Sequence, residues 1–427
     1  MFKTLKQLFT KKNKDIRKRV YFTLAVLTLF VVGTTIEVPG TQEITKSLGF
    51  LELLDVMGGG ALSNFSIFAL GVTPYITASI VMQLLQMDIV PYFADLAKQG
   101  HAGRQKINKI TRYLGIFFAF IQGFAMAYAF LGSSVTMLQR LEVAFIMTAG
   151  TAFLLWLGDQ VTQKGIGNGV SLIIMAGIVS SLPGMMITAF KELVDFSTTN
   201  TLISGGATFL LFLIICFLVI VAVIFVEGAA RRISIQYANK STANLGKQSY
   251  MPIKINSAGV IPVIFASSLL AVFSVVAQFS KSDKVVNFIN NYLDYTTPVG
   301  LIIYVVLIIF FTYFYTFVQM KPDQMAENLQ KNGGYVPGIR PGNDTEKYFV
   351  TVLKRLTTVG ALFLAAIAAF PIILNMCTGL PRTVSIGGTS LLIVVGVAIE
   401  TYKQLESSLL SREYSPNKRT NSKRARR

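Results

Sequence analysis

The sequence predicts an all-α, polytopic membrane protein with ten transmembrane helices. Of its 427 residues, 52% are hydrophobic and only 14% are charged. The mean hydropathy is +0.57, and this combination excludes an ordinary soluble protein. Apolar windows long enough to be membrane spans recur along the chain. The loops between them alternate between rich and poor in lysine and arginine, which supports the count of ten.

Each window is close to the length that crosses the hydrocarbon core of a bilayer as a helix. An even number of spans places both chain termini on the same side of the membrane. The ten predicted spans are residues 20–36, 65–87, 113–131, 143–158, 169–190, 207–226, 257–278, 299–319, 356–374 and 384–399.

Basic residues give the orientation of these spans. The N-terminal arm, the C-terminal part and every second loop together hold 33 of the 39 lysines and arginines. Because basic loops stay in the cytoplasm, both termini are predicted to be cytoplasmic. Two cytoplasmic loops, 227–256 and 320–355, are long and rich in turn residues. Long loops in a compact protein are often binding surfaces.

The stretch 50–87 is the most unusual part of the chain. Its first part, 50–62, is too short and too acidic to span a membrane, and three glycines end it. Pro74 lies inside the following apolar window, where it would free the Leu70 carbonyl of a helix. Non-helical backbone at membrane depth is tolerated only inside protein or beside a water-filled cavity. We therefore expect a pore or cavity; the alternative is a surface loop before a kinked span.

No enzyme chemistry is predicted. The run Gly165–Gly169 resembles a nucleotide loop, but Val170 stands where GxGxxG needs its third glycine. A turn that opens a helix, with Asn168 as N-cap, fits better. The chain has one histidine and two distant cysteines, which predicts neither a histidine-based metal site nor a disulfide framework. The span interiors hold no ionisable residue, which argues against an ion-coupled transporter.

Two polar features have competing interpretations. Hydroxyls and amides inside the spans are either contacts between helices or the lining of a seam that opens; they are Thr77, Ser79, Gln83, Gln122, Ser267 and Ser268. Arg340 lies between two turns, in the run Gly338–Gly342. A guanidinium held in a rigid turn can bind carboxylate or phosphate. The alternative is a basic residue that serves topology only.

Five stretches of the chain resemble the SecY family, the central channel subunits of the Sec protein translocase, in its bacterial form. The resemblance covers almost the whole chain. The stretches are Phe65–Gly71 with Pro74–Ser79, Lys164–Ser171, Asn256–Ser268, Gly334–Gly342 and Gly387–Val395.

The resemblance implies two pseudosymmetric five-helix halves, 20–190 and 207–405, around an hourglass pore. An external hinge loop, 191–206, joins them. A basic amphipathic arm, 1–19, precedes them and a basic tail, 406–427, follows. A ring of apolar side chains forms the waist, where a narrow apolar constriction dewets and bars ions. By position in the matching stretches, the ring is Val72, Ile76, Ile174, Ile178, Ile264 and Ile393.

The resemblance also implies a plug, a short helix at about 51–62 that fills the outer vestibule at rest. Its predicted site residues are Leu54, Asp55, Gly58, Gly59 and Gly60. A lateral gate would lie between the second and seventh spans, with polar contacts from Thr77, Gln83, Gln122 and Ser268. A signal sequence would enter lipid there, because an apolar segment of ~20 residues is more stable in hydrocarbon.

The partners that the resemblance implies are the membrane subunits SecE and SecG, the SecA ATPase, the ribosome, preproteins with their signal peptides, and lipid. It implies no cofactor, and it places the chain in the bacterial plasma membrane. The residues expected to dock SecA or the ribosome are Arg340, Arg231, Arg232, Lys240 and Lys247. The expected function is thus a passive protein-conducting channel driven by its partners. The alternatives are a secondary transporter with broken helices and a membrane scaffold.

Overall fold

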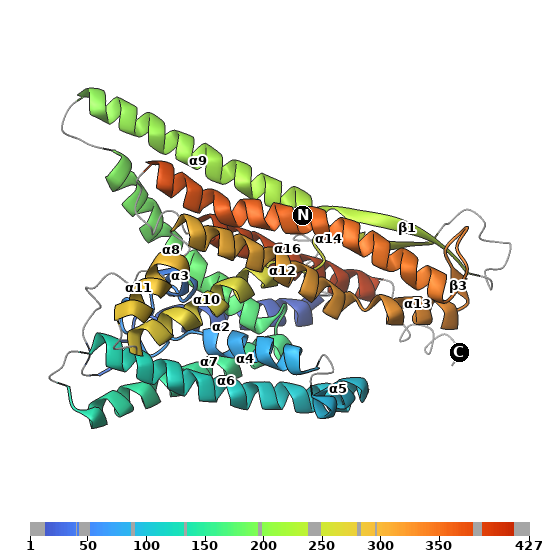
Figure 1. The fold of residues 1–427 in the computed structure, drawn as a ribbon, viewed down its shortest axis with the longest axis horizontal. Coiled ribbons are helices and arrows are strands. Elements are labelled where there is room, and N and C mark those ends of the chain that lie inside the picture. The colour runs from blue at the N-terminus through green and yellow to red at the C-terminus, as the bar shows by residue number, and fades with distance from the viewer. Residues whose placement is uncertain are drawn as a thin grey trace, which may run out of the picture.

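The computed structural model is a bundle of long helices with a small sheet at one end (Figure 1). It describes residues 13–39, 41, 52–86, 90–131, 135–194, 199–237, 249–279, 283–294, 297–378 and 387–413. The helices are α2 (Lys14–Gly33), α3 (Glu52–Met57), α4 (Thr73–Leu84), α5 (Pro91–Lys98), α6 (Gly100–Phe130), α7 (Met137–Lys164), α8 (Gly169–Leu193), α9 (Thr199–Gly228), α10 (Ile261–Phe279), α11 (Asp283–Tyr292), α12 (Pro298–Met320), α13 (Pro322–Lys331), α14 (Asn343–Thr378) and α16 (Gly387–Glu413).

The multi-pass membrane architecture is confirmed. Among the described residues, six stretches are long and apolar enough to cross a membrane, and they contain α6, α7, α8, α9, α12 and α14. The other four predicted spans correspond to α2, α4, α10 and α16. The count of ten spans therefore stays a prediction that the observed helices are consistent with. Large apolar side chains such as Leu210, Phe217 and Phe225 project from α9 into the surroundings, as expected for a lipid-facing surface.

The two long basic loops form one folded body, which we call the sheet domain. Strands β1 (Ala230–Tyr237), β2 (Ser249–Lys254) and β3 (Gly334–Tyr335) make an antiparallel sheet in the order β2-β1-β3. Since alternate side chains of a strand face opposite sides, Ile233 and Ile235 point inward, onto Phe349 of α14. The sequence predicted turn-rich loops here, and the strands, α13 and the first turns of α14 were missed.

The sheet domain lies at one end of the bundle, together with α5, and α11 lies at the opposite end (Figure 1). The order of elements along the chain explains this separation. Consecutive long helices run in alternating directions, so that every second connection returns to the same end. The alternation of basic and non-basic loops predicted the same grouping.

Three predicted boundaries are wrong. Pro74 does not kink a continuing helix but opens α4, and residues 61–72 before it form turns. Proline is favoured in the first turn of a helix, since the N–H that it lacks has no partner there. The expected hinge loop 191–206 is shorter, because α8 ends at Leu193 and α9 begins at Thr199. The expected tail from residue 406 begins as the last turns of α16.

Candidate functional site

The six residues predicted to form the pore ring are all buried in the apolar core of the bundle. All of them belong to one cluster of buried apolar side chains, and each is at most 8% exposed. Val72 immediately precedes α4, which carries Ile76, and α8 carries Ile174 and Ile178 at a spacing of four residues. Ile264 comes from α10 and Ile393 from α16. Four separate parts of the chain thus contribute these residues to one buried apolar cluster.

The predicted plug joins the same cluster. The short helix α3 contributes Val56 and Met57 to the cluster that contains the ring residues, and Leu54 lies in the same helix. The expected helix was longer, about 51–62, but Gly58, Gly59 and Gly60 end it in a turn. Gly59 and Gly60 both have φ of +78°, a conformation that glycine adopts at little cost. The glycines therefore form the turn that leads from α3 back toward α4.

Asp55 holds this turn in place. Its Oδ1 accepts hydrogen bonds from the backbone N–H groups of Leu62 at 2.8 Å and Ser63 at 2.9 Å. Burial raises the pKa of the Asp55 carboxyl, and the bonds from Ser63 and Leu62 oppose that shift. The carboxyl thus acts as a buried acceptor for a stretch of backbone that has no helical partners.

Residues 61–72 carry irregular backbone deep inside the bundle. Three helices make room for it with glycines: a Cβ on Gly150 of α7 would lie 2.0 Å from the Ile67 carbonyl oxygen. Gly33 of α2 and Gly123 of α6 similarly face side chains of this segment. Phe65, at 2% exposure, adopts a φ of +47°, which a bulky residue keeps only when its surroundings hold it. The condition for non-helical backbone at membrane depth, enclosure by protein, is met.

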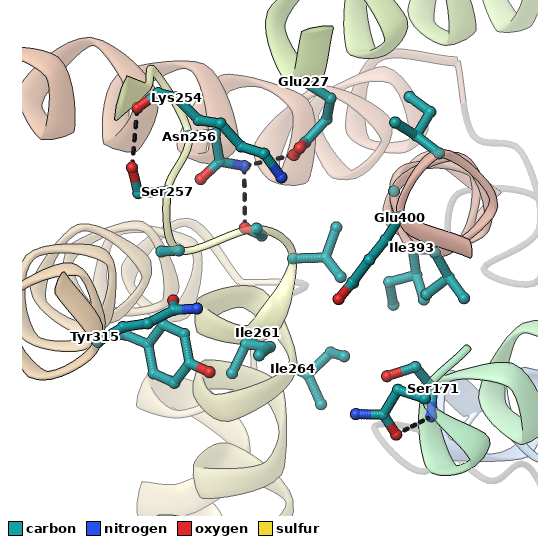
Figure 2. Close-up of a pocket in the computed structure, with 18 of the residues that line it drawn as sticks. Ser171, Glu227, Lys254, Asn256, Ser257, Ile261, Ile264, Tyr315, Ile393 and Glu400 are labelled. Atoms are coloured by element: carbon teal, nitrogen blue, oxygen red, sulfur yellow. Dashed lines mark hydrogen bonds between the residues drawn. The ribbon is translucent and has the colours of Figure 1, made fainter. Parts of the chain in front are cut away.

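A cavity of about 330 Å³ opens beside the ring on the side of the sheet domain. Figure 2 shows side chains of α8, α9, α10, α12 and α16 around it, with Ile261 and Ile264 on α10 and Ile393 on the side of α16. Ile174 also lines it. Asn168 lies at its edge and is the N-cap of α8, because its Oδ1 accepts from the N–H groups of Val170 and Ser171. That prediction is confirmed.

Two residues of this cavity were missed in the sequence. Asn256 donates to Glu227 Oε1 at 2.6 Å and to the Gly259 carbonyl at 3.0 Å (Figure 2). Glu227 is 7% exposed and Asn256 is 2% exposed. The pair joins the end of α9 to the backbone that starts α10, beside the sheet domain. No short motif signals a bond between residues 29 positions apart.

Val260 was missed as well, although a signal for it is present. It is buried in the same cluster as the ring and lines the cavity. A Cβ on Gly396 of α16 would lie 2.9 Å from Val260 Cγ1, so α16 approaches closely here. The signal is the repeated pattern G-V-x-P-x-I, which occurs at residues 71–76 and again at 259–264. Val260 is the counterpart of Val72 in that repeat.

The predicted gate residues lie on neighbouring helices but are not bonded to one another across the seam. Helices α4, α6 and α10 are in mutual contact. Thr77 donates to the Thr73 carbonyl and Gln83 donates to Ser79 Oγ, both within α4. Ser268 is buried on α10 and Gln122 is half-buried on α6. Among the described side chains, Gln83 Oε1 is one of the few buried polar atoms without a hydrogen bond.

An ion pair joins two of the long helices. Arg112 of α6 and Asp159 of α7 approach to 2.5 Å. Both residues fall just outside the predicted spans 113–131 and 143–158, and the helices extend further than those spans. The pair joins α6 and α7 on the half of the bundle that carries α4.

Three of the five predicted docking residues are exposed on the sheet domain. Arg231 and Arg232 project from β1. Arg340 is exposed in a turn whose glycines, Gly338 and Gly342, have φ of +80° and +100°. Its carbonyl oxygen accepts a bond of 2.8 Å from the buried Thr345 hydroxyl, which fixes the turn. Lys240 and Lys247 lie outside the described residues.

Comparisons with known proteins agree on the family. The SecY family model matches residues 66–402. The protein translocase subunit SecY of Staphylococcus aureus strain NCTC 8325 is 49% identical over 97% of this chain and 99% of its own. That of Staphylococcus epidermidis strain RP62A is 50% identical with the same coverage.

Solved structures share the fold. A structure described as a protein-conducting channel has a TM-score of 0.67 at 20% identity, covering 94% of this chain and 95% of its own. A SecY structure described for its plug domain has a TM-score of 0.67 at 21% identity, with the same coverage. Canine Sec61 in a ribosome-channel complex has a TM-score of 0.64 at 20% identity, again with that coverage.

Proposed function

The chain belongs to the SecY family, and we propose that it is the protein-conducting channel of a bacterial Sec translocase. In this role it passes unfolded secretory preproteins across the plasma membrane. It also releases transmembrane segments into lipid through a lateral gate. Both termini, the sheet domain and α5 lie in the cytoplasm, as the distribution of basic residues predicts.

The observation that carries the proposal is the single apolar cluster that contains the six ring residues and the plug residues Val56 and Met57. A constriction lined only by valine and isoleucine loses water and so bars ions. An extended polypeptide can pass such a ring, because the side chains come from several helices that can separate. The plug closes the constriction from the side opposite the cavity. In a structural neighbour, the plug domain is described as stabilising the closed state and maintaining a membrane seal.

The gate is the contact between α4 and α10. Each helix carries ring residues at its start and polar or small side chains further along. Thr77 and Gln83 belong to α4, Ser268 to α10 and Gln122 to α6, and these three helices are in mutual contact, which supports assigning the four residues to the gate. Because the hydrogen bonds of Thr77 and Gln83 stay within α4, separating α4 from α10 breaks none of them. A seam of this kind opens at low cost when an apolar segment enters it.

The energy source lies outside the chain, in SecA or a translating ribosome, and the chain itself is not an enzyme. SecE and SecG complete the membrane complex. Arg231, Arg232 and Arg340 dock the driving partners, together with Lys240 and Lys247. The ribosome is named with a structural neighbour, canine Sec61. Contacts with ribosomal RNA phosphates would weaken with salt.

Reconstitution tests the proposal against the alternatives. Proteoliposomes that contain the chain and SecE, supplied with SecA and ATP, should import a preprotein with a functional signal sequence. A preprotein without its signal sequence is the matched control. A scaffold would import neither. A secondary transporter would instead accumulate a small solute along an ion gradient without SecA, and that result would contradict the proposal.

The docking role of Arg340 has its own test. Arg340→Glu should reduce SecA-driven import strongly, since a charge reversal at a bidentate contact removes an attraction and adds a repulsion. Stability should change by less than about 0.5 kcal/mol because the side chain is exposed. Lys347→Glu, a charge reversal elsewhere on the sheet domain, is the control. Unchanged import in Arg340→Glu would mean that Arg340 does not dock SecA and serves only as a basic residue for membrane topology.

A further inference from the structure

The backbone of the plug helix α3 lies so close to the backbone of α8 that only glycine fits between them at position 177. A Cβ built on Gly177 of α8 would lie 2.2 Å from the carbonyl oxygen of Met57 and 3.1 Å from the N of Gly59. These are backbone atoms, which cannot rotate away as a flexible side chain does. Any residue larger than glycine at position 177 therefore displaces the end of α3 or the turn after it.

The close approach is reciprocal. Gly59 faces back toward α8, and a Cβ built on it would lie 2.6 Å from Ser180 Oγ and 3.2 Å from the Cα of Gly177. Gly59 also has a positive φ, so a side chain there would be strained for a second reason. Two glycines on separate segments thus allow two backbones to meet.

A hydroxyl adds a polar contact to this joint. Ser181, one turn after Gly177 on α8, donates toward the carbonyl oxygen of Val56 at 3.1 Å. Its other acceptor, also at 3.1 Å, is the carbonyl of Gly177 in its own helix. The last carbonyls of a helix have no partner within it, and α3 has only six residues. The Val56 carbonyl already accepts from the Gly59 N–H at 3.2 Å, and Ser181 adds a second hydrogen bond to it from outside α3.

We propose that Gly177 and Ser181 form a plug seat: a docking site on α8 that sets how firmly the plug is held at rest. This inference rests on the proposed channel function and names positioning residues for it. A six-residue helix is not stable by itself, because nucleation of a helix is unfavourable. It therefore depends on the wall against which it packs. Because Gly177 has no side chain, the backbones of α3 and α8 can come into contact. The Ser181 hydroxyl then fixes the orientation of α3 through its hydrogen bond to the Val56 carbonyl.

The seat also suits a plug that must leave. Apart from the apolar contacts of Val56 and Met57, the described hydrogen bond from α8 to α3 is the one from Ser181. When α3 departs, that hydroxyl keeps its bond to the Gly177 carbonyl. No buried donor on α8 is then left without a partner, so that undocking avoids the large cost of an unsatisfied polar group.

The test measures how often the plug leaves its seat. Met57 is buried under α8, so a cysteine at this position should react with a charged, membrane-impermeant maleimide only when the plug is undocked. The full-length chain would carry Met57→Cys with Cys216→Ala and Cys377→Ala. The labelling rate would then be compared among three variants of α8: Gly177→Ala, Ser181→Ala and the control Gly184→Ala. Gly184 lies on the same helix, and a Cβ there has nothing within 4 Å.

We expect labelling to be roughly tenfold faster in Gly177→Ala, because forcing a methyl group into a closed contact is unfavourable. Ser181→Ala should accelerate it about fivefold through the lost hydrogen bond. Gly184→Ala should leave the rate unchanged. Alanine is the better helix former, so neither glycine variant weakens α8 itself. The melting temperature in detergent should stay close to that of the parent chain, which a general loss of folding would not allow.

Equal labelling rates in Gly177→Ala and Gly184→Ala, with Ser181→Ala also unchanged, would overturn the plug seat. If Gly177→Ala fails to fold, Ser181→Ala decides, since it removes one oxygen atom and adds nothing. The labelling assay needs no SecA, ATP or preprotein. A chain that imports no preprotein but shows the expected labelling pattern would therefore refute the proposed function and leave the seat in place.

Discussion

The segments 71–76 and 259–264 share the pattern G-V-x-P-x-I and begin α4 and α10 in the same way. Gly71 and Gly259 have φ of +56° and +64°, a left-handed conformation that glycine adopts at little cost, just before each helix. In each segment the carbonyl of the valine accepts from the N–H groups three and four residues later, at 3.1–3.4 Å. The valine and the isoleucine of both copies are buried in the ring cluster. One local signal thus produces two matching helix starts.

What surrounds the two segments differs. The first is preceded by the irregular stretch 61–72 and the plug, which close the cluster on its side. The second is preceded by Asn256, whose amide joins it to Glu227, and it borders the 330 Å³ cavity. The same six-residue pattern therefore supports a sealed side in one half and an open vestibule in the other. The comparison teaches that the asymmetry of the channel arises outside the repeat.

The largest effect on channel closure should come from a polar amide introduced into the ring to which both segments contribute. Ile76→Asn and Ile264→Asn each place an amide without partners among valine and isoleucine side chains, at a cost of roughly 3 kcal/mol or more. Both should increase ion leak through resting channels in liposomes and admit preproteins with defective signal sequences. Ile264→Val is the conservative control. If only one of these two variants increases the ion leak, the two segments do not share one constriction.

A smaller effect, on stability, should come from removing the hydrogen bond between Asn256 and Glu227, which has no counterpart among the described residues before the first segment. Asn256→Ala leaves the buried Glu227 carboxylate without its donor, which should destabilise the fold by about 1–3 kcal/mol. Thermal unfolding in detergent measures this loss. Ser257→Ala is the control, because the Ser257 hydroxyl bonds a carbonyl on a more exposed face. A loss no larger than that of the control would mean that the link does not hold the start of α10.

Truncating Val72 and Val260 to alanine should lower the free energy of unfolding by amounts that differ by about 1 kcal/mol. Val72→Ala creates a cavity in a closed core and should lower the free energy of unfolding by about 2 kcal/mol. Val260→Ala enlarges a cavity that already exists and should lower it by about half as much. Chemical or thermal unfolding of both variants gives the comparison. Equal losses would indicate that the cavity is filled or closed around Val260.

The smallest effect should be a pH dependence confined to the plug side. Burial raises the pKa of Asp55 above its ordinary value of 3.8, so protonation stabilises the docked plug. That contribution is complete below pH 3.8 and is lost as the pH rises through the raised pKa. Labelling of Met57→Cys should therefore slow as the pH falls, after correction for maleimide reactivity. Asp55→Asn, which keeps the acceptor without the charge, should remove the dependence.

Much of the site could be predicted from the sequence because it follows short stretches. The N-cap at Asn168 and the turns around Arg340 lie within a few residues of the motif that signals them, and the ring residues stay an assignment from stretches that resemble the family. Pro74 was misread because proline both kinks a helix and opens one, and the local sequence does not distinguish the two. The strands were missed because their inward side, Ile233 and Ile235, is short and lies in a basic, turn-rich segment.

The sequence by itself determined the membrane class, the grouping of the basic loops at one end of the bundle and the N-cap of α8. Hydropathy, charge and turn chemistry act over a few residues or by simple alternation. The tertiary structure alone decided that α3 packs against Gly177 and Ser181, that Asn256 bonds Glu227, and that both basic loops share one sheet. These contacts join segments far apart in the chain, and they depend on how closely two backbones can approach.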